Sequence, residues 1–291
     1  MSDSLRIPDW LKTNGSKLHA ARHLSKILEE EVPNSICQEA RCPNRSECFA
    51  KGVLTFMILG TICTRACAFC SVAHGKPLPP DPHEAETLIR SIKKLNLKFV
   101  VLTSPNRDDL PDNGSGHYAR VVSAIKEALP DVKVEILIPD FKGNKAHLAI
   151  AMASKPDVVN HNLETVPELY RSIRKGSLYQ RSLDVLATMK QINPLSLTKT
   201  GLMVGLGETV DQLKRTFADI QAVGVDILTL GQYLKPDKTS ADVQKYYHPD
   251  EFDVLKQLAL DGGIRHVFSG PFVRSSFLAE SVFDDVLRKV A

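Results

Sequence analysis

The sequence predicts an α/β fold, an open six-stranded (βα)6 partial TIM barrel with an N-terminal extension and a C-terminal helical extension. Apolar runs of strand length alternate with segments of helical periodicity, which is the pattern of a parallel sheet with right-handed crossovers. The 291 residues are 43% hydrophobic, enough for one barrel-sized core. Residues 231–291 hold mainly two helical patterns, so the two further units of a closed eight-fold barrel do not fit.

The predicted strands are short apolar runs. The first is almost continuously apolar, as expected of a strand that is covered on both faces. The strands are expected at residues 53–60, 98–103, 132–138, 157–163, 197–204 and 225–230.

The predicted helices follow from apolar residues at helical spacing and from terminal signals. Asp81 followed by Pro82 predicts the start of the first barrel helix. The sequence T-V-D-Q predicts a capping box of Thr209 and Gln212, and Gly224 ends the helix that follows. Further helical patterns cover residues 17–31, 115–129, 250–261 and 276–290.

This organisation predicts three parts of the chain. Residues 1–52 form an N-terminal extension, residues 53–235 form the partial barrel, and residues 236–291 form a C-terminal extension that closes it. Active sites of such sheets lie at the carboxyl ends of the strands. Functional residues are therefore expected in the loops that follow the strands.

Composition excludes several function classes. A formal net charge of +3 is too small to indicate a nucleic-acid partner. The sequence has no run of 18 apolar residues, so no membrane span is predicted. Asp3 and Asp9 argue against an acid-poor transit peptide, and we expect a cytoplasmic protein.

The cysteines point to chemistry, because all six lie between positions 37 and 70. Cys63, Cys67 and Cys70 form a C-x3-C-x2-C group directly after the first strand, with Phe69 before the last of them. Three thiolates fill three corners of a 4Fe–4S cluster and leave one iron open for a substrate. Disulfides are disfavoured because no secretory signal is evident, and a zinc knuckle usually shows two paired sets. We call residues 61–71 the second cysteine loop.

An earlier segment, residues 37–48, carries Cys37, Cys42 and Cys48 with the spacing C-x4-C-x5-C. We call it the first cysteine loop. Its proline, asparagine and serine residues predict turns that can wrap three sulfurs around a compact centre. A zinc site completed by a distant histidine is the alternative, but the neighbouring triad favours a second iron–sulfur centre.

Polar residues follow other strands as well. Asn160, Asn162 and Glu164 alternate onto one face at the end of the fourth strand, where they call for a ligand or for each other. His161 is expected to face away from this site. The fifth strand leads into G-L-M-V-G-L-G-E, whose glycines would let the backbone approach a ligand. Other polar residues beyond strand ends, some of which serve equally well as turn residues, are Asp108, Asp109, Asn113, Gln232 and Tyr233.

Together these motifs resemble the lipoyl synthase family of the radical S-adenosylmethionine (SAM) superfamily. The resemblance extends from Trp10 to Phe277. The matching pieces are the two cysteine triads, R-D-D-L-P, H-N-L-E-T, G-L-M-V-G-L-G-E and R-S-S-F. The paired triads are the most specific of these, because most radical SAM enzymes lack the first.

The resemblance implies a sulfurtransferase that inserts sulfur at C6 and C8 of an octanoyl chain on a lysine of a lipoyl carrier protein. It implies two 4Fe–4S clusters and two SAM molecules per product, with the auxiliary cluster as the sulfur donor. The implied carrier partners are the E2 domains of 2-oxoacid dehydrogenases and the glycine cleavage H protein. A ferredoxin or flavodoxin would supply electrons, and an iron–sulfur carrier would rebuild the auxiliary cluster.

The resemblance also assigns roles to single residues. The expected ligands of the SAM cluster are Cys63, Cys67 and Cys70. The expected ligands of the auxiliary cluster are Cys37, Cys42, Cys48 and, as the fourth, Ser275 of R-S-S-F. The residues expected to bind SAM are Phe69, Asn162 and Glu164.

The chain departs from the family pattern at three places. Phe277 stands where the family commonly has tyrosine, Ala66 follows Arg65 where a basic pair is usual, and Thr61-Ile62 stands where Asp-Thr is common. None of these changes removes an expected ligand. Two other classes stay open from the residues alone: another sulfur-inserting radical SAM enzyme of the biotin synthase type, and an iron–sulfur or zinc protein that only carries electrons or scaffolds partners.

Overall fold

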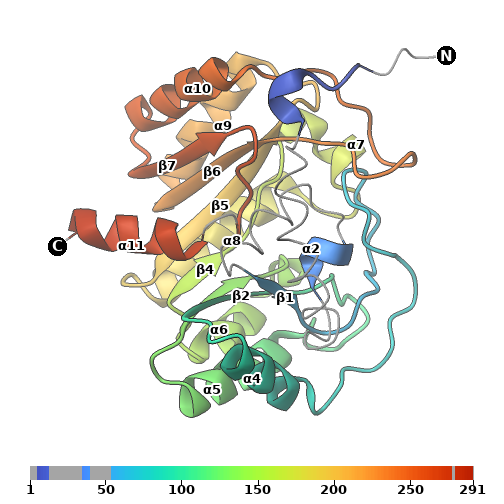
Figure 1. Cartoon of the computed structure of the whole chain (residues 1–291), viewed down its shortest axis with the longest axis vertical. Coiled ribbons are helices and arrows are strands. Elements are labelled where there is room, and N and C mark those ends of the chain that lie inside the picture. The colour runs from blue at the N-terminus through green and yellow to red at the C-terminus, as the bar shows by residue number, and fades with distance from the viewer. Residues whose placement is uncertain (1–4, 13–34, 40–53, 277–278, 291) are drawn as a thin grey trace. The chain divides into compact units, whose positions relative to one another are not determined.

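Parallel strands alternate with helices along the computed structural model, which describes residues 5–12, 35–39, 54–276 and 279–290 (Figure 1). These residues divide between two compact units. The β1–β4 unit comprises Asn14–Arg65, Val72–Asn160 and Ser276–Ala291. The β5–β7 unit comprises Met1–Thr13, Ala66–Ser71 and His161–Ser275. The second cysteine loop therefore contributes residues to both units.

The strands of the β1–β4 unit are hydrogen-bonded in chain order and are all parallel. They are β1 Thr55–Met57, β2 Phe99–Thr103, β3 Lys133–Leu137 and β4 Val158–Asn160. Every residue of β1, β2 and β4 is buried, which explains why most of their residues are apolar.

The main helices of this unit are α4 Glu84–Lys94, α5 Ser115–Ala128, α6 Lys145–Ala153 and α11 Ala279–Val290. Shorter elements are α2 Ile36–Glu39 and the 3-10 turn η2 Phe141–Gly143. Figure 1 shows α4, α5 and α6 gathered along one side of the strands. Phe283 of α11 packs on Phe99 of β2 with ring centroids 5.5 Å apart, so the end of the chain also covers this sheet.

The strands of the β5–β7 unit are also parallel and in chain order: β5 Leu197–Val204, β6 Ile227–Gln232 and β7 His266–Gly270. Its helices are α7 Tyr170–Ile173, α8 Tyr179–Ile192, α9 Val210–Ala222 and α10 Pro249–Asp261. The 3-10 turns are η1 Asp9–Leu11 and η3 Pro167–Leu169.

The six predicted strands are all present: β5 has the predicted bounds, and the bounds of the other five are shifted. The strand β7 was not predicted, because its sequence H-V-F-S-G has only two apolar residues and only Val267 is fully buried. The predicted helices are confirmed, apart from the one at residues 17–31, which lies outside the described residues.

Of the two predicted helix starts, one is confirmed and one is wrong. The capping box of Thr209 and Gln212 is confirmed, with both reciprocal hydrogen bonds present. The start predicted at Asp81 and Pro82 was wrong, because α4 begins at Glu84. Asp81 instead closes the turn before the helix, where its Oδ1 accepts from the backbone N–H of His83 at 2.9 Å.

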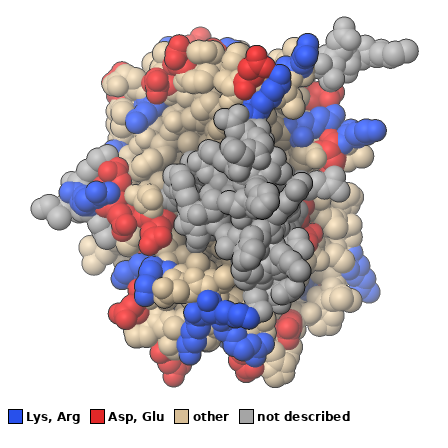
Figure 2. All heavy atoms as spheres, viewed as in Figure 1, with Lys and Arg blue, Asp and Glu red and all other residues tan. Residues whose placement is uncertain are grey.

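The described surface carries both signs of charge. On the face seen in Figure 2, basic and acidic side chains are interspersed over the described residues. This mixture agrees with the small net charge of +3. None of the helices that the structure describes is long and apolar enough to cross a membrane.

Candidate active site

Cys63 lies in the β1–β4 unit, in the loop that follows β1. Its backbone is fixed by hydrogen bonds with Ala73 and Gly75, at 2.8 and 2.9 Å. Its half-buried sulfur accepts two backbone N–H groups, from Arg65 at 3.4 Å and from Asn106 at 3.3 Å. Amide hydrogen bonds to sulfur are typical of the thiolates that hold iron–sulfur clusters, so the surroundings of Cys63 fit that role.

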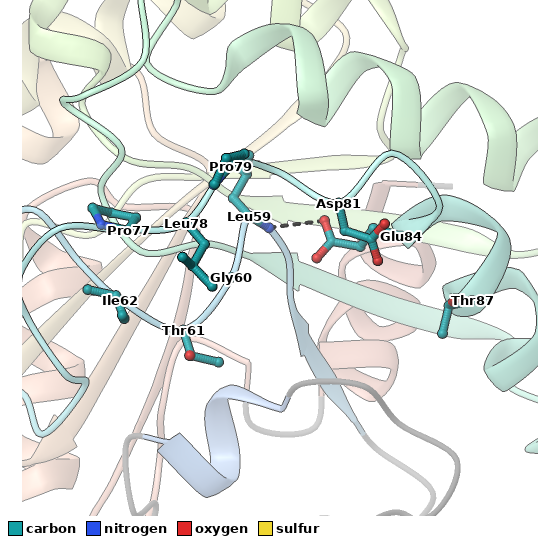
Figure 3. Close-up of a pocket in the computed structure, with 10 residues that line it drawn as sticks. All are labelled: Leu59, Gly60, Thr61, Ile62, Pro77, Leu78, Pro79, Asp81, Glu84 and Thr87. Atoms are coloured by element: carbon teal, nitrogen blue, oxygen red, sulfur yellow. Dashed lines mark hydrogen bonds between the residues drawn. The ribbon is translucent and has the colours of Figure 1, made fainter.

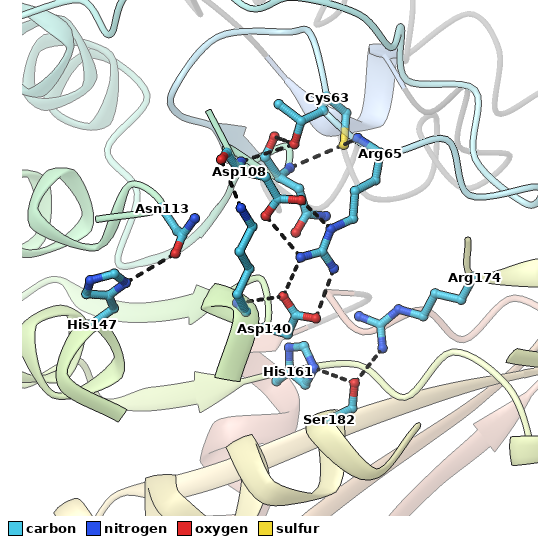
Figure 4. A network of polar contacts seen from close by, with 12 residues as sticks. Cys63, Arg65, Asp108, Asn113, Asp140, His147, His161, Arg174 and Ser182 are labelled. Atoms are coloured by element: carbon cyan, nitrogen blue, oxygen red, sulfur yellow. Dashed lines mark hydrogen bonds and ion pairs between the residues drawn. The ribbon is translucent and has the colours of Figure 1, made fainter. Parts of the chain in front are cut away.

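Beside Cys63 a buried arginine joins two further loops (Figure 4). The guanidinium of Arg65 binds the carboxylate of Asp108 at 2.7 and 3.0 Å and that of Asp140 at 2.7 and 2.9 Å. Burial opposes the charge of Arg65, but the hydrogen bonds to Asp140 and Asp108 outweigh it and raise the pKa of the guanidinium. Arg65 is thus a permanent cation shared by two anions.

The loop after β2 was predicted to hold either site or turn residues, and the structure separates them. Asp108 joins the arginine beside Cys63. Asp109 instead pairs with Arg107 at 2.8 Å. Asn113 contacts the His147 ring at 3.2 Å, and its N–H donates to the carbonyl of Leu110 at 3.1 Å. Asp109 and Asn113 are therefore structural in this unit.

The turn between β1 and the second cysteine loop is supported by a buried carboxylate. Leu59 has a positive φ of 67°, and its N–H donates to Glu84 Oε2 at 3.0 Å. Glu84 also holds the ring of His117, whose other nitrogen contacts Arg120. A pocket of about 220 Å³ opens beside this turn (Figure 3). Its two carboxylates, Asp81 and Glu84, accept backbone N–H groups from His83 and Leu59. Both carboxylates therefore stabilise the backbone around the pocket.

Cys67 and Cys70 lie in the β5–β7 unit. The N–H of Cys70 donates to the carbonyl of Cys67 at 3.1 Å, which closes a turn between them. Between the two cysteines, Ala68 donates to the carbonyl of Ile173 at 2.8 Å and accepts from Ala241 at 2.7 Å. Both cysteines are half-buried and free of disulfides.

Phe69, expected at the cofactor site, packs at the edge of a small apolar cluster of the same unit. The cluster consists of Ile173, Leu206 and Tyr233, and Phe69 is only partly buried against it. The ring therefore anchors the cysteine turn while part of it stays accessible.

One hydrogen-bonded group contains the side chains of Asn162, Glu164 and Ser275, and we call it the Asn162 group. Asn162 and Ser275 are 113 residues apart along the chain. The Asn162 amide donates to Glu164 Oε1 at 3.0 Å and to Ser275 Oγ at 2.6 Å. Asn162 Oδ1 is buried and accepts no hydrogen bond from any described residue. A buried acceptor without a partner is costly, and a bound ligand would satisfy it.

Gly201 makes room for this group. A Cβ at position 201 would lie 2.9 Å from Asn162 Oδ1, 2.9 Å from Thr229 Oγ1 and 3.2 Å from Ser275 Oγ. By contrast, the space beside Gly205 is filled by Gln232 and by the carbonyl of Lys245, so that glycine serves internal packing rather than a ligand.

Two arginines set the electrostatics around Glu164. Burial raises the pKa of Glu164, although Arg174 and Arg274 nearby oppose the rise. Arg174 is 8% exposed and donates to Tyr170 Oη and Ser182 Oγ at 2.8 and 2.9 Å. Burial opposes the charge of Arg174, but the electrostatic interactions with Tyr170, Glu164 and Cys67 outweigh it and raise the pKa of Arg174. Arg174 was missed from the sequence, because nothing marks it among the charged residues around it.

The other expected residues differ in how fully the described residues satisfy their polar groups. His161 is fully buried and its ring contacts Ser182 of α8, away from Asn162, as predicted. Gln232 satisfies three carbonyl groups with its amide, and Tyr233 donates to Ala241 at 2.8 Å. Asn160 donates to Glu135 of β3 at 3.0 Å, and its own oxygen is buried without a described partner.

The first cysteine loop is described only at its start. Cys37 is buried in α2, which follows an antiparallel bridge between Ser35 and Phe56 of β1. Cys42 and Cys48 lie outside the described residues. Within either unit, no three described His, Cys, Asp or Glu side chains gather as a metal site, and the cysteines of the second loop are divided between the units. The roles of both triads therefore stay predictions.

Known proteins resemble this chain over most of its length. Residues 57–220 match the family model described as the radical SAM superfamily. The chain is 46% identical over 286 residues to the lipoyl synthase of Acidithiobacillus ferrooxidans, covering 98% of this chain and 90% of that one. It is 47% identical over 283 residues to the lipoyl synthase of Haemophilus influenzae, covering 96% and 88%. A crystal structure of methylornithine synthase matches with a TM-score of 0.54 at 15% identity, over 88% of this chain and 78% of that one, which supports the partial-barrel fold.

Proposed function

Because the chain belongs to the lipoyl synthase family of the radical SAM superfamily, we propose that it inserts sulfur at C6 and C8 of an octanoyl chain amide-linked to a lysine of a lipoyl carrier protein. It is a sulfur-inserting radical SAM enzyme, and its family implies a 4Fe–4S cluster and SAM. The observation that carries the proposed sulfur insertion at C6 and C8 is the pair of cysteine triads, C-x4-C-x5-C and C-x3-C-x2-C, within residues 37–70.

The chemistry explains why one cluster must make a radical. The C–H bonds at C6 and C8 are too weakly acidic for any side-chain base, so hydrogen must be removed as an atom. When bound, the cluster supplies the electron that cleaves SAM into methionine and a 5′-deoxyadenosyl radical. In our proposal Cys63, Cys67 and Cys70 hold three of its irons, and two SAM molecules are used per product.

We propose SAM contacts for Asn162 and Glu164 because their side chains offer hydrogen-bond acceptors to a ligand. Asn162 Oδ1 is a buried acceptor with no described partner, and Glu164 is a carboxylate beside it. Both suit a ligand with an ammonium group, as SAM has. The half-exposed ring of Phe69 would line the same cofactor.

The second cluster is proposed as the sulfur source, and so as a co-substrate. Its ligands in this proposal are Cys37, Cys42, Cys48 and Ser275. An alkoxide is a harder ligand than a thiolate and matches iron–sulfur poorly, so Ser275 would be released readily when the cluster gives up sulfur. The hydrogen bond from Asn162 to Ser275 Oγ, 2.6 Å long, supports a serine oxygen that is presented as an acceptor.

The proposed partners follow from the reaction. The substrates are octanoylated E2 domains of 2-oxoacid dehydrogenases or the glycine cleavage H protein, with a ferredoxin or flavodoxin as reductant. An iron–sulfur carrier would rebuild the auxiliary cluster after each turnover. We propose that the protein works in the cytoplasm without a nucleic-acid or membrane partner.

Turnover on an octanoyl-lysine peptide, read by mass spectrometry, tests the proposal. The anaerobically reconstituted protein should contain about eight irons per chain and add two sulfur atoms to the peptide. Turnover of dethiobiotin instead, or zinc in place of iron, would contradict the proposal.

Two cysteine variants separate the two loops in the same assay. Cys67→Ala should abolish SAM cleavage while the auxiliary cluster still assembles. Cys42→Ala should still cleave SAM but make no lipoyl product. Lipoyl product from the Cys42 variant without added sulfide would exclude the sacrificial cluster.

A further inference from the structure

The sulfur of Cys63 is held by donors from two separate loops. The N–H of Arg65 lies two residues along the same loop, and the N–H of Asn106 comes from the loop after β2. The two donors keep their aim only if these loops stay in register.

Two contacts lock the loops together. Thr64 donates through its backbone N–H and its hydroxyl to the carbonyl of Asn106, at 3.0 and 2.9 Å. The same hydroxyl accepts from the N–H of Asp108 at 3.1 Å. Thr64 thus bridges both ends of the segment that points Asn106 at the sulfur.

The Arg65 guanidinium ties the same loops to a third. It binds Asp108 after β2 and Asp140 after β3, and the Arg65 and Asp140 side chains are 4% and 0% exposed. Lys142, just beyond Asp140, also donates to the carbonyl of Asp108 at 3.1 Å. We call Arg65, Asp108 and Asp140 the arginine clamp.

We propose that the arginine clamp is a positioning device that holds both backbone N–H groups on the Cys63 sulfur and so sets the reduction potential of the cluster that Cys63 binds. The proposal rests on Cys63 being an iron ligand, as proposed above. Arg65, Asp108 and Asp140 are positioning residues, because none of them has to touch the cluster.

The sign of the effect follows from charge. Reduction adds negative charge to an iron–sulfur cluster, and N–H groups aimed at its sulfurs stabilise that charge. A loosened clamp should therefore lower the reduction potential. The field of Arg65 itself contributes little, because two carboxylates already surround it.

The test uses substitutions that leave every charge in place. Arg65→Lys keeps the cation but cannot bridge two carboxylates with a planar fork. Thr64→Val removes the bridging hydroxyl without any change of charge or great change of shape. Arg107→Lys is the matched control, since Arg107 is equally buried but pairs with Asp109 and with the carbonyls of Leu59 and Leu78.

Each variant is made in the full chain with Cys37, Cys42 and Cys48 replaced by alanine, so that one cluster gives the spectroscopic signal. Redox titration followed by electron paramagnetic resonance measures the potential. At a fixed solution potential, Arg65→Lys should lower the ratio of reduced to oxidised cluster by about tenfold, a shift of about 59 mV for one electron. Thr64→Val should shift it in the same direction by less.

The outcomes distinguish this inference from the proposed function. If the parent chain binds no cluster through Cys63, Cys67 and Cys70, the proposed function itself fails. If it binds one and both variants keep the parental potential, the clamp does not act on the cluster. An equal fall in Arg107→Lys would mean that any loosening of this loop has the effect, and would overturn the specific role of the clamp.

Discussion

The arginine clamp and the group around Asn162 are both polar and both buried, but they differ in completeness. All three side-chain nitrogens of Arg65 donate to carboxylates. Asn162 uses its amide for Glu164 and Ser275, whereas its Oδ1 has no partner among the described residues. An unmet buried acceptor costs about 1–3 kcal/mol. In our proposal the clamp maintains the fold of its loops, whereas the unmet acceptor of Asn162 is left for a ligand.

The largest expected effect is on the amount of lipoyl product, and it follows from a substitution in the Asn162 group. Ser275→Ala should reduce doubly thiolated product to background while SAM cleavage persists, because in our proposal Ser275 is the fourth ligand of the auxiliary cluster. Stability should fall by only about 1 kcal/mol, the usual net worth of one hydrogen bond, because Asn162 still donates to Glu164. Ser276→Ala is the matched control and should keep full turnover. Normal turnover of the Ser275 variant, or a structure with the Ser275 hydroxyl far from an intact auxiliary cluster, would refute the assignment.

The next largest effect is on the free energy of unfolding. Here the arginine clamp is expected to be more sensitive to substitution than the Asn162 group. Asp140→Ala should lower the free energy of unfolding by about 3–5 kcal/mol, because it leaves Arg65 buried with one carboxylate removed. Asn162→Ala should cost only about 1 kcal/mol, since it also removes the unpaired oxygen. Urea unfolding of both apoproteins measures the contrast. Equal costs would remove the distinction between the two regions.

A smaller effect is expected at Gly201. Gly201→Ala places a methyl group 2.9 Å from Asn162 Oδ1, and overpacking of this kind costs about 1–3 kcal/mol. It should weaken SAM binding and product formation together, as measured by equilibrium binding and turnover. Gly262→Ala is the control, because Gly262 has an ordinary φ of −73° and lies at the end of α10. SAM affinity unchanged in the Gly201 variant would show that the cofactor does not use this space.

The smallest effect concerns pH. Burial raises the pKa of Glu164 above its ordinary value of 4.5. A raised carboxyl pKa adds stability that is fully present below the unfolded pKa and is lost as the pH rises through the folded one. The stability difference between wild type and Glu164→Gln should therefore shift against the wild type as the pH rises above about 4.5. A difference that moves the other way would mean that Arg174 and Arg274 dominate.

The sequence predicted the local features of the site and missed those that depend on distant partners. The cysteine spacings, the six strands and the alternation of Asn162 with Glu164 are local patterns, and the strands and the Asn162–Glu164 contact are present. Arg65 and Asp140 are 75 residues apart, and no local pattern pairs them. The burial of Arg174 depends in the same way on how α7 and α8 pack.

Gln232 illustrates the opposite error. Its predicted place beyond a strand end put it among the polar residues of the site. In the structure it is the last residue of β6, and its amide nitrogen donates to three backbone carbonyls. Position along a strand predicts which edge a side chain lies on. It does not predict which neighbours will satisfy that side chain.

Our proposal assigns radical formation to the second cysteine loop and sulfur supply to the first. A single turnover with auxiliary cluster assembled from heavy-isotope sulfide, in buffer free of sulfide, tests it most directly. A sacrificed auxiliary cluster should give a lipoyl product with both sulfur atoms heavy, and at most one product per chain. Light sulfur in the product, or several turnovers per chain without a cluster supply, would contradict it.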